Sequence, residues 1–390
     1  MKIIYKLFAF VILLCIITPS DCFSQSSDKV NHRVPVFISG EEGYKSFRIP
    51  AIVQTPKGDL LAFCEGRVNH AGDFGHIELV MKRSKDNGAT WSKLQVVARN
   101  GELQVCTTAP VFDLTDPHFP KGRLFLFYNT GDVSEADILA GKGDKRCWFI
   151  TSTDNGYTWS DPVDITSLVK KTDWRYYANT PGHAIQLKAG LYKGRIYEAA
   201  NHSYGNPQPN GKHYRAHGYY TDDHGKTFQL SNDIAYPGSN ESMAVELTGG
   251  KLMMNSRNQQ GDIKARLVSL SHDGGITWET PQVDSVLIDP VCQGSILSLS
   301  EKDGQTILAF CNAADTIARN NLTLRISYDE GKNWHDKFLI YAPKQSQSQK
   351  TDYAAYSDLV RLDDIRIGIL FEKDNYATIE FCIVDWTKHP

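Results

Sequence analysis

The octet Ser84-Lys85-Asp86-Asn87-Gly88-Ala89-Thr90-Trp91 decides the fold of this chain, because the sequence contains five copies of it. The copies share the pattern Ser/Thr-x-Asp-x-Gly-x-Thr-Trp/Phe, with Asn333 replacing the threonine in the last one. Successive copies start roughly 50 to 70 residues apart, so the same motif recurs along most of the chain. The other four copies occupy residues 152–159, 221–228, 271–278 and 327–334.

Each octet has the composition of a hairpin turn. Its aspartate can accept backbone N–H groups across the turn, its glycine supplies a positive φ, and its aromatic residue can pack beneath. A single copy would be an ordinary turn, whereas five copies predict a repeat fold. We interpret the five aspartates as structural, since they are far apart in the chain and suit a turn better than a metal or catalytic site.

A second periodic signal lies between the octets, where a turn containing Gly or Asp precedes an apolar, β-rich run. Long amphipathic helices are absent from the sequence pattern, and only 135–140 and 167–171 resemble short helices. The pattern predicts an all-β chain folded as a six-bladed β-propeller of four-stranded antiparallel sheets. We expect Val34–Ile38 to close the ring by pairing with Thr378–Val384. The six runs are 60–63, 124–128, 196–200, 252–254, 307–311 and 367–371.

The N-terminus has the features of an export signal. Two lysines precede the apolar run Leu7 to Ile17, which is too short to span a bilayer, and small residues precede Gln25. We expect a signal peptide over 1–24 and a single propeller domain over 25–390, with no membrane span once the signal is removed. The expected location is periplasmic or secreted; an uncleaved anchor or a lipid-modified Cys22 are the alternatives.

Composition narrows the possible partners. The 390 residues carry a formal net charge of −3, so the sequence does not indicate nucleic acid or anionic lipid as a partner. None of the six cysteines beyond the leader has CxxC spacing, and no His/Cys cluster points to a metal or another cofactor. Cys64, Cys311 and Cys382 lie in apolar runs, where a buried free thiol is expected.

Arg48 lies between Phe47 and Ile49 immediately before a proline, and Arg67, Arg257 and Arg319 occur in similarly unusual settings. A propeller gathers the ends of its inner strands around one axis, so these arginines should converge. Several guanidinium groups in one pocket repel one another unless an anion joins them, and their planar donors match a carboxylate. The sequence therefore predicts a substrate that carries a carboxylate. The other candidates at these strand ends are Asp73, Glu241, Tyr356 and Glu372.

These motifs together resemble the exo-α-sialidases (neuraminidases) of the bacterial and animal Asp-box, or BNR-repeat, type. The likeness covers about residues 33 to 386. Besides the octets it rests on Phe47-Arg48-Ile49-Pro50, Glu65-Gly66-Arg67, Gly72-Asp73, Asn240-Glu241, Ser256-Arg257-Asn258, Cys292-Gln293-Gly294-Ser295, Arg319-Asn320-Asn321-Leu322-Thr323, Tyr356-Ser357-Asp358-Leu359 and Phe371-Glu372.

The resemblance implies a set of substrate-binding residues. Arg48, Arg257 and Arg319 would form the triad that grips the carboxylate of sialic acid. Glu372 would orient Arg48, and Arg67 would contact the sugar on its 4-hydroxyl or acetamido side.

The resemblance also implies three catalytic residues: Tyr356 as nucleophile, Glu241 as its general base and Asp73 as acid/base catalyst. The chemistry suits these residue types, because sialic acid carries a carboxylate on its anomeric carbon that would repel a carboxylate nucleophile but not a neutral phenol. The expected reaction is hydrolysis of terminal α-ketosidically linked sialic acids from glycoproteins, glycolipids and oligosaccharides, with retention through a tyrosyl-enzyme intermediate.

Other functions stay open at this point. A trans-sialidase or an intramolecular trans-sialidase would share every catalytic residue. A non-catalytic sialic-acid-binding propeller would keep the arginines but should lack Asp73, Glu241 or Tyr356. Many relatives carry an Asn-Pro or Asp-Pro pair where this chain has Cys106-Thr107-Thr108-Ala109, so the sequence does not assign the residues that bind the N-acetyl and glycerol groups.

Overall fold

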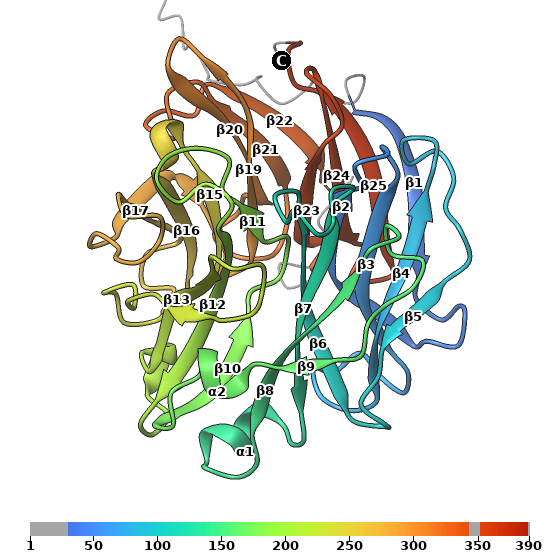
Figure 1. The fold of residues 1–390 in the computed structure, drawn as a ribbon, viewed down its shortest axis with the longest axis vertical. Helices are drawn as coiled ribbons and strands as arrows, with labels where there is room; N and C mark the ends of the chain where they lie inside the picture. The colour runs from blue at the N-terminus through green and yellow to red at the C-terminus, as the bar shows by residue number, and fades with distance from the viewer. Residues whose placement is uncertain (1–29, 343–351, 389–390) are drawn as a thin grey trace, which may run out of the picture.

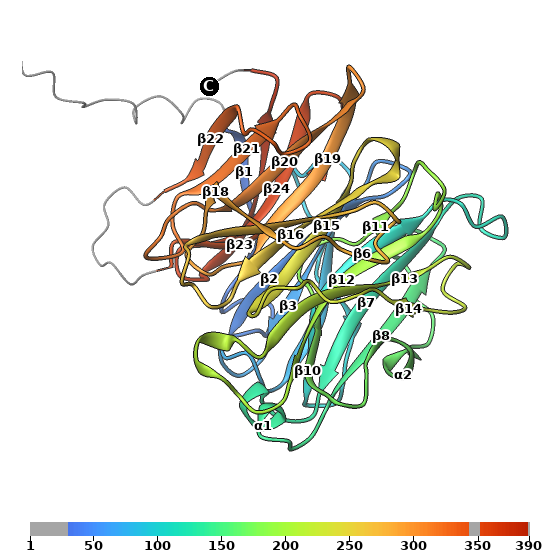
Figure 2. The ribbon, with the colours of Figure 1, turned by 90° about the vertical axis from the view of Figure 1, so that its left-hand side faces the viewer.

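A computed structural model describes residues 30–342 and 352–388 of the chain, so the expected signal peptide at 1–24 lies outside the described residues. The described residues form an all-β architecture whose sheets stand around a common centre (Figures 1 and 2). The expected β-propeller is therefore confirmed. Two short helices accompany the strands, α1 (Glu135–Leu139) and α2 (Thr166–Val169), close to where the sequence predicts them.

The strands follow one another in antiparallel units. The first unit consists of β2 (Ser46–Gln54), β3 (Leu60–Arg67), β4 (Ile77–Ser84) and β5 (Gln95–Ala98). The second consists of β6 (Gln104–Asp113), β7 (Arg123–Gly131), β8 (Lys145–Ser152) and β9 (Val163–Asp164). The third consists of β10 (Trp174–Asn179), β11 (Ile185–Gln186), β12 (Ile196–Tyr204), β13 (Tyr214–Thr221) and β14 (Gln229–Leu230).

The second half of the chain continues the pattern. The fourth unit consists of β15 (Ser239–Glu246), β16 (Leu252–Asn258), β17 (Ala265–Ser271) and β18 (Gln282–Ile288). The fifth consists of β19 (Gly294–Lys302), β20 (Gln305–Ala313), β21 (Leu322–Ser327) and β22 (Asp336–Tyr341). The sixth consists of β23 (Ala354–Arg361), β24 (Arg366–Lys373), β25 (Thr378–Asp385) and β1 (Val30–Ile38).

The sixth unit joins the two ends of the chain. β1 pairs antiparallel with β25, with Val34 opposite Phe381 and Ile38 opposite Thr378, which confirms the predicted closure. The hydrogen bonds depart from six separate four-stranded sheets in two places. A parallel bridge between Ile77 and Gln104 joins the first two units into one eight-stranded sheet, and β11 adds a fifth strand to the third unit.

The octets form the hairpin turns that their composition predicts. In the first octet, Thr90 donates its backbone N–H to Asp86 over 2.9 Å, and Gly88 donates its own to the hydroxyl oxygen of Ser84 over 2.7 Å. In the other copies too, the backbone N–H of the seventh residue donates to the turn carboxylate, at Asp154, Asp223, Asp273 and Asp329. The five aspartates therefore act within their own turns.

The first octet also packs the first unit against β25 of the sixth unit. Gly88 has φ +87°, and a Cβ atom built there would lie 2.1 Å from the ring of Phe381 in β25. The Trp91 ring packs edge-on against the same phenylalanine, with ring centroids 5.6 Å apart. A glycine is therefore required at this position both for its backbone conformation and for the space.

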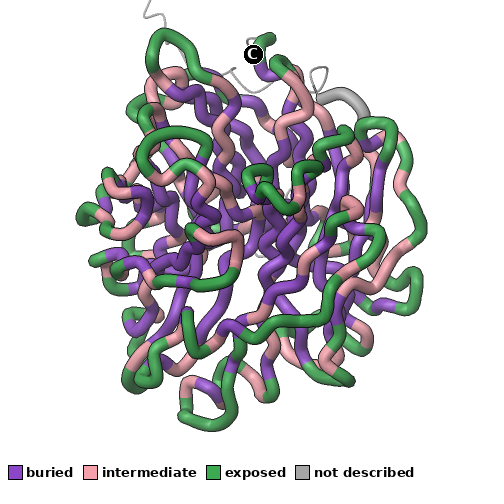
Figure 3. Tube along the Cα trace, in the orientation of Figure 1, coloured by how far each residue is buried: buried purple, intermediate pink, exposed green. Residues whose placement is uncertain are grey.

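Burial follows the strands, while the loops around them are exposed (Figure 3). All six cysteines of the described chain are buried and free, which confirms the expectation for Cys64, Cys311 and Cys382. Among the residues that the structure describes, no helix has the length and apolar composition needed to cross a membrane.

Candidate active site

A pocket of about 460 Å³ is lined by residues from all six units. Its volume lies in the range typical of small-molecule sites. Of the eight candidate residues, Glu372 alone does not line the pocket, and it bonds to Arg48 instead. The seven other candidate residues line the pocket: Arg48, Arg67, Asp73, Glu241, Arg257, Arg319 and Tyr356.

The strands that open the units are bulged where they reach the pocket. The pairing shifts register between Arg48 and Ala51 in β2, between Ser239 and Ser242 in β15, and between Ala354 and Ser357 in β23. Ile49 has φ +60°, an uncommon conformation for a β-branched residue. Bulges turn side chains away from the regular alternation of a strand, so they direct Arg48, Glu241 and Tyr356 into the pocket.

Glu372 fixes the position of Arg48. Its two carboxylate oxygens accept hydrogen bonds from Nε and Nη2 of Arg48 over 2.9 and 3.0 Å. The same oxygens accept the backbone N–H groups of Ile49 over 2.8 Å and Tyr356 over 3.1 Å. Burial opposes the charge of Arg48, but the Glu372 carboxylate holds the pKa of Arg48 above its usual value.

Tyr356, Glu241 and Arg257 form a tight cluster. The Tyr356 hydroxyl donates to Oε1 of Glu241 over 2.6 Å, and Nη1 of Arg257 lies 2.5 Å from Oε2 of Glu241 and 3.1 Å from the Tyr356 oxygen. Burial and the Glu241 charge raise the pKa of Tyr356, while Arg257 and Arg319 oppose that rise. The phenol is therefore protonated in the free protein and hydrogen-bonded to a carboxylate.

A second tyrosine, which the sequence analysis did not single out, holds two of the three arginines. The guanidinium carbon of Arg48 lies 3.9 Å from the centroid of the Tyr376 ring, and Nη1 of Arg319 donates to the Tyr376 hydroxyl oxygen over 3.2 Å. That hydroxyl in turn donates to Asp352. Tyr376 ends a run of three residues with positive φ in the turn between β24 and β25, a conformation that is common for Asp and Asn but uncommon for a bulky tyrosine.

Asp73 lies between two arginines at the pocket mouth. Its Oδ1 is 2.7 Å from Nη1 of Arg67 and 3.7 Å from Nη1 of Arg48, although its side chain is 81% exposed. Partial burial raises the pKa of Asp73, but the charges of Arg67, Arg48 and Arg319 outweigh it and bring that pKa below its usual value. Asp73 is therefore ionised at neutral pH in the free protein.

Arg67 is held by a carboxylate that the sequence analysis gave no role. Glu65 accepts from Nε and Nη2 of Arg67 over 3.0 and 2.7 Å, and its other oxygen accepts the backbone N–H of Thr107 over 3.1 Å. Glu65 and Arg67 lie two residues apart on β3, so their side chains share a face of the strand. That spacing is the one signal that could have identified the pair.

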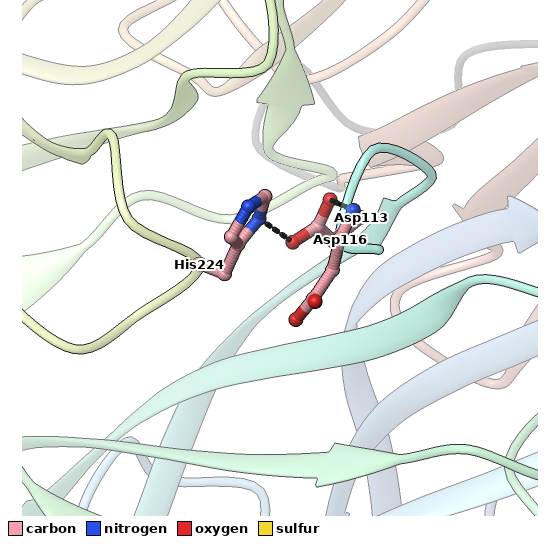
Figure 4. Close-up of side chains that lie close together, drawn as sticks. All are labelled: Asp113, Asp116 and His224. Atoms are coloured by element: carbon pink, nitrogen blue, oxygen red, sulfur yellow. Dashed lines mark hydrogen bonds and ion pairs between the residues drawn. The ribbon is translucent and has the colours of Figure 1, made fainter. Parts of the chain in front are cut away.

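Two other features of the described residues are structural. His183 bonds to Asp358 through Nδ1 over 2.8 Å. Asp113, Asp116 and His224 lie close enough together to suggest a metal site (Figure 4). However, Asp113 already accepts bonds from His224 and from Gln186, and Asp116 pairs with Arg123 at 3.0 Å. With their oxygens satisfied and a guanidinium adjacent, these groups do not indicate a cation site.

Comparison with known proteins agrees with this arrangement. A family model for the BNR repeat-like domain matches residues 58–369. The chain is 30% identical over 356 residues to a sialidase from Micromonospora viridifaciens, covering 86% of this chain and 51% of that one, so it spans about half of that relative. It is 31% identical to an exo-α-sialidase from Arthroderma benhamiae, covering 86% of this chain and 79% of the relative.

The fold has a solved counterpart. The structure of the Hadza microbial sialidase Hz136 superposes with a TM-score of 0.78 at 23% sequence identity, covering 92% of this chain and 69% of that one. At that identity the superposition speaks for the propeller alone. The family model and the sequence relatives show more than the fold: this chain belongs to the BNR-repeat family of exo-α-sialidases.

Proposed function

We propose that this protein is a retaining exo-sialidase that hydrolyses terminal α-ketosidically linked sialic acids from glycoproteins, glycolipids and oligosaccharides. One observation carries the proposal. A phenol, hydrogen-bonded over 2.6 Å to a carboxylate, lies in the same pocket as three arginines from different units of the propeller. A nucleophile with its base and a clamp for an anion are thus adjacent.

The three arginines would bind the substrate carboxylate. Arg48 is oriented by Glu372, and Arg319 is oriented by Tyr376. Arg257 lines the same pocket, and its Nη1 lies near both Glu241 and Tyr356. A carboxylate bound among these groups would relieve their mutual repulsion.

The first half of the reaction would use all three catalytic residues. As the Tyr356 oxygen attacks the anomeric carbon, Glu241 takes the phenolic proton. Asp73 gives a proton to the glycosidic oxygen, and the aglycone leaves. The product of this half is a sugar joined to Tyr356, with Glu241 protonated and Asp73 ionised.

The second half would reverse these proton movements. Asp73 takes a proton from a water molecule that attacks the anomeric carbon, and the bond to Tyr356 breaks. Glu241 returns its proton to the phenolate. Two inversions at one carbon give overall retention.

Substrate binding would prepare Asp73 for its role as an acid. In the free protein the charges of Arg67, Arg48 and Arg319 keep the pKa of Asp73 low. A bound carboxylate neutralises part of that positive field, so the pKa of Asp73 should rise in the complex. The acid is then formed where it is needed, beside the bound glycoside.

The test is to incubate the protein with 2,3- and 2,6-linked sialyllactose and to follow the products by NMR. Free sialic acid that appears first as the α-anomer supports retaining hydrolysis. An anhydro sugar or transfer to an added acceptor would instead support an intramolecular or intermolecular trans-sialidase. Release from neither linkage, with binding retained, would contradict the proposal and support a lectin.

A further inference from the structure

Lys145 places an unusual charge in the wall of the pocket. It begins β8, its residue is only 3% exposed, and it lines the pocket beside Cys106 and Tyr176. Its Nζ lies 3.0 Å from the Cys106 sulfur and 3.5 Å from the Tyr176 hydroxyl oxygen. Within the described parts of the chain, Nζ forms no ion pair with a carboxylate. Nζ also lies 4.9 Å from the centroid of the Tyr176 ring, so the ammonium is buried against a thiol, a phenol and a ring face, without a charged acceptor.

The arginines that line the same pocket have carboxylate partners, unlike Lys145. Arg67 has a two-bond contact with Glu65, and Arg48 has one with Glu372. A thiol is a poor acceptor, and burial raises the pKa of the Cys106 thiol, so this sulfur does not supply a thiolate partner. A buried ammonium without a good acceptor is costly, which indicates that a ligand oxygen completes its surroundings.

A continuous series of contacts relates Lys145 to the acid/base residue. Asp73 contacts Arg67, Arg67 is held by Glu65, and the other oxygen of Glu65 accepts the N–H of Thr107. The Thr107 hydroxyl lies 3.8 Å from the sulfur of Cys106, which contacts Lys145. Lys145 thus lies several contacts around the wall from the residues that would act on the glycosidic bond.

The chemistry of the sugar says which group could reach that part of the wall. In a sialic acid ring the anomeric C2 bears the carboxylate, and C5 lies across the ring from it. With the carboxylate on the arginines, the C5 acyl group and the neighbouring glycerol chain point away from them. Both groups can present oxygen atoms to an ammonium.

We propose that Lys145 is a specificity-determining residue, which donates a hydrogen bond to an oxygen of these distal substituents and so favours a hydroxylated acyl group at C5. This inference rests on the proposed sialidase function. Both acyl groups share a carbonyl oxygen, but an N-glycolyl group adds a terminal hydroxyl that can also accept from Nζ, where an N-acetyl group has a methyl. Sites built to bind a substrate hydroxyl discriminate strongly against analogues that lack it.

The experiment compares Lys145→Met with the wild-type protein on three aryl sialosides that share one leaving group. The first carries N-glycolyl at C5, the second carries N-acetyl, and the third carries N-acetyl with the glycerol chain shortened by periodate and borohydride. Lys82→Met is the matched control, because Lys82 is another shielded lysine but pairs with Glu42 outside the pocket.

In the wild-type protein we expect kcat/KM for the N-glycolyl substrate to exceed that for N-acetyl about tenfold, the effect of one hydrogen bond. Lys145→Met should bring this ratio close to one, and Lys82→Met should leave it unchanged. If Lys145→Met affects the N-glycolyl and N-acetyl substrates equally but does not affect the substrate with the shortened chain, the oxygen that accepts from Nζ belongs to the glycerol chain. That pattern would overturn the proposed preference for a hydroxylated acyl group.

A uniform change on all three substrates would overturn the inference, since it would show that Lys145 does not sense the distal groups. Should Lys145→Met fail to fold, as judged by thermal melting, Lys145→Gln is measured in the same way. The two proposals fail separately: a wild-type protein that cleaves none of the substrates contradicts the sialidase function, whereas an active protein with uniform ratios contradicts only the role of Lys145.

Discussion

The hydroxyl oxygen of Tyr356 lies 2.6 Å from a carboxylate oxygen of Glu241, although the two residues are 115 positions apart in the chain. Bulges in β23 and β15 direct the two side chains toward each other. A neutral phenol that already donates to a base needs little rearrangement before it attacks. This pair is therefore the centre of the proposed mechanism.

Tyr356→Phe removes the attacking oxygen and keeps the ring. We expect kcat on sialyllactose to fall at least about 10³-fold, as for other nucleophile deletions, while sialic acid still binds because the arginines remain. Turnover and calorimetric binding measure the two effects. Tyr220→Phe is the control, since its hydroxyl bonds to Gln229 away from the pocket and its loss should leave turnover intact. Turnover in Tyr356→Phe close to that of the wild type would exclude the nucleophile role.

Asp73→Asn tests proton donation through its dependence on the leaving group. Lactose needs a proton to depart, so kcat/KM on sialyllactose should fall about 10² to 10⁴-fold. 4-Nitrophenolate leaves without one, so the first half-reaction on the nitrophenyl sialoside should fall far less in a stopped-flow burst. Equal losses on the two substrates would mean that Asp73 does not protonate the leaving group.

The pH dependence of the wild-type protein follows from the lowered pKa of Asp73. The acid is active when protonated, so kcat/KM, which reports the free protein, should decline as the pH rises above that lowered pKa. In the complex the substrate carboxylate offsets the arginines, so the decline in kcat should occur at higher pH. Rate profiles from pH 3 to 8 measure both curves. If the two basic limbs coincide, substrate binding does not raise the pKa of Asp73.

Tyr376→Phe tests the contact that the sequence did not predict. The ring stays over Arg48, but Arg319 loses its acceptor at 3.2 Å. We expect KM to rise about tenfold to a hundredfold, the effect of one hydrogen bond to a charged group, with little change in kcat. A fall in kcat at constant KM would instead assign Tyr376 to the chemical step.

Gly88→Ala tests the junction between the first unit and the closing strand. The added Cβ would lie 2.1 Å from the Phe381 ring, and the alanine would have to adopt φ +87°. We expect the free energy of unfolding to fall by about 2 kcal/mol or more, through overpacking and backbone strain. Urea denaturation gives the value. Gly58→Ala is the control, because Gly58 also has positive φ but nothing within 4 Å of its Cβ position, and it should cost less.

The repeat pattern was sufficient to predict the propeller and its closure. Five octets impose the same turn at a regular period, and β1 lies against β25 as the apolar runs at the two ends indicate. The bridge between Ile77 and Gln104 could not be predicted, because it depends on the approach of two units and not on either sequence.

The site divides in a similar way. Arg48, Arg257, Arg319 and Tyr356 could be placed together because each was expected at or just after a strand near the propeller axis, and the pocket contains them all. Tyr376 and Lys145 escaped notice for a physical reason. Tyr376 reaches the arginines only because three successive residues have positive φ. A lysine in a strand is usually solvated, and the sequence does not show that Lys145 lies beside Cys106.

The most direct measurement is to trap the intermediate. A 2,3-difluorosialic acid offers a good leaving group at C2, and its fluorine at C3 slows hydrolysis of the tyrosyl adduct, so the sugar should remain attached. Mass spectrometry of the digested protein should find the sugar on the peptide that contains Tyr356, and the Tyr356→Phe protein should remain unlabelled. An adduct on another residue, or rapid turnover with no adduct on Tyr356, would contradict nucleophilic attack by this phenol.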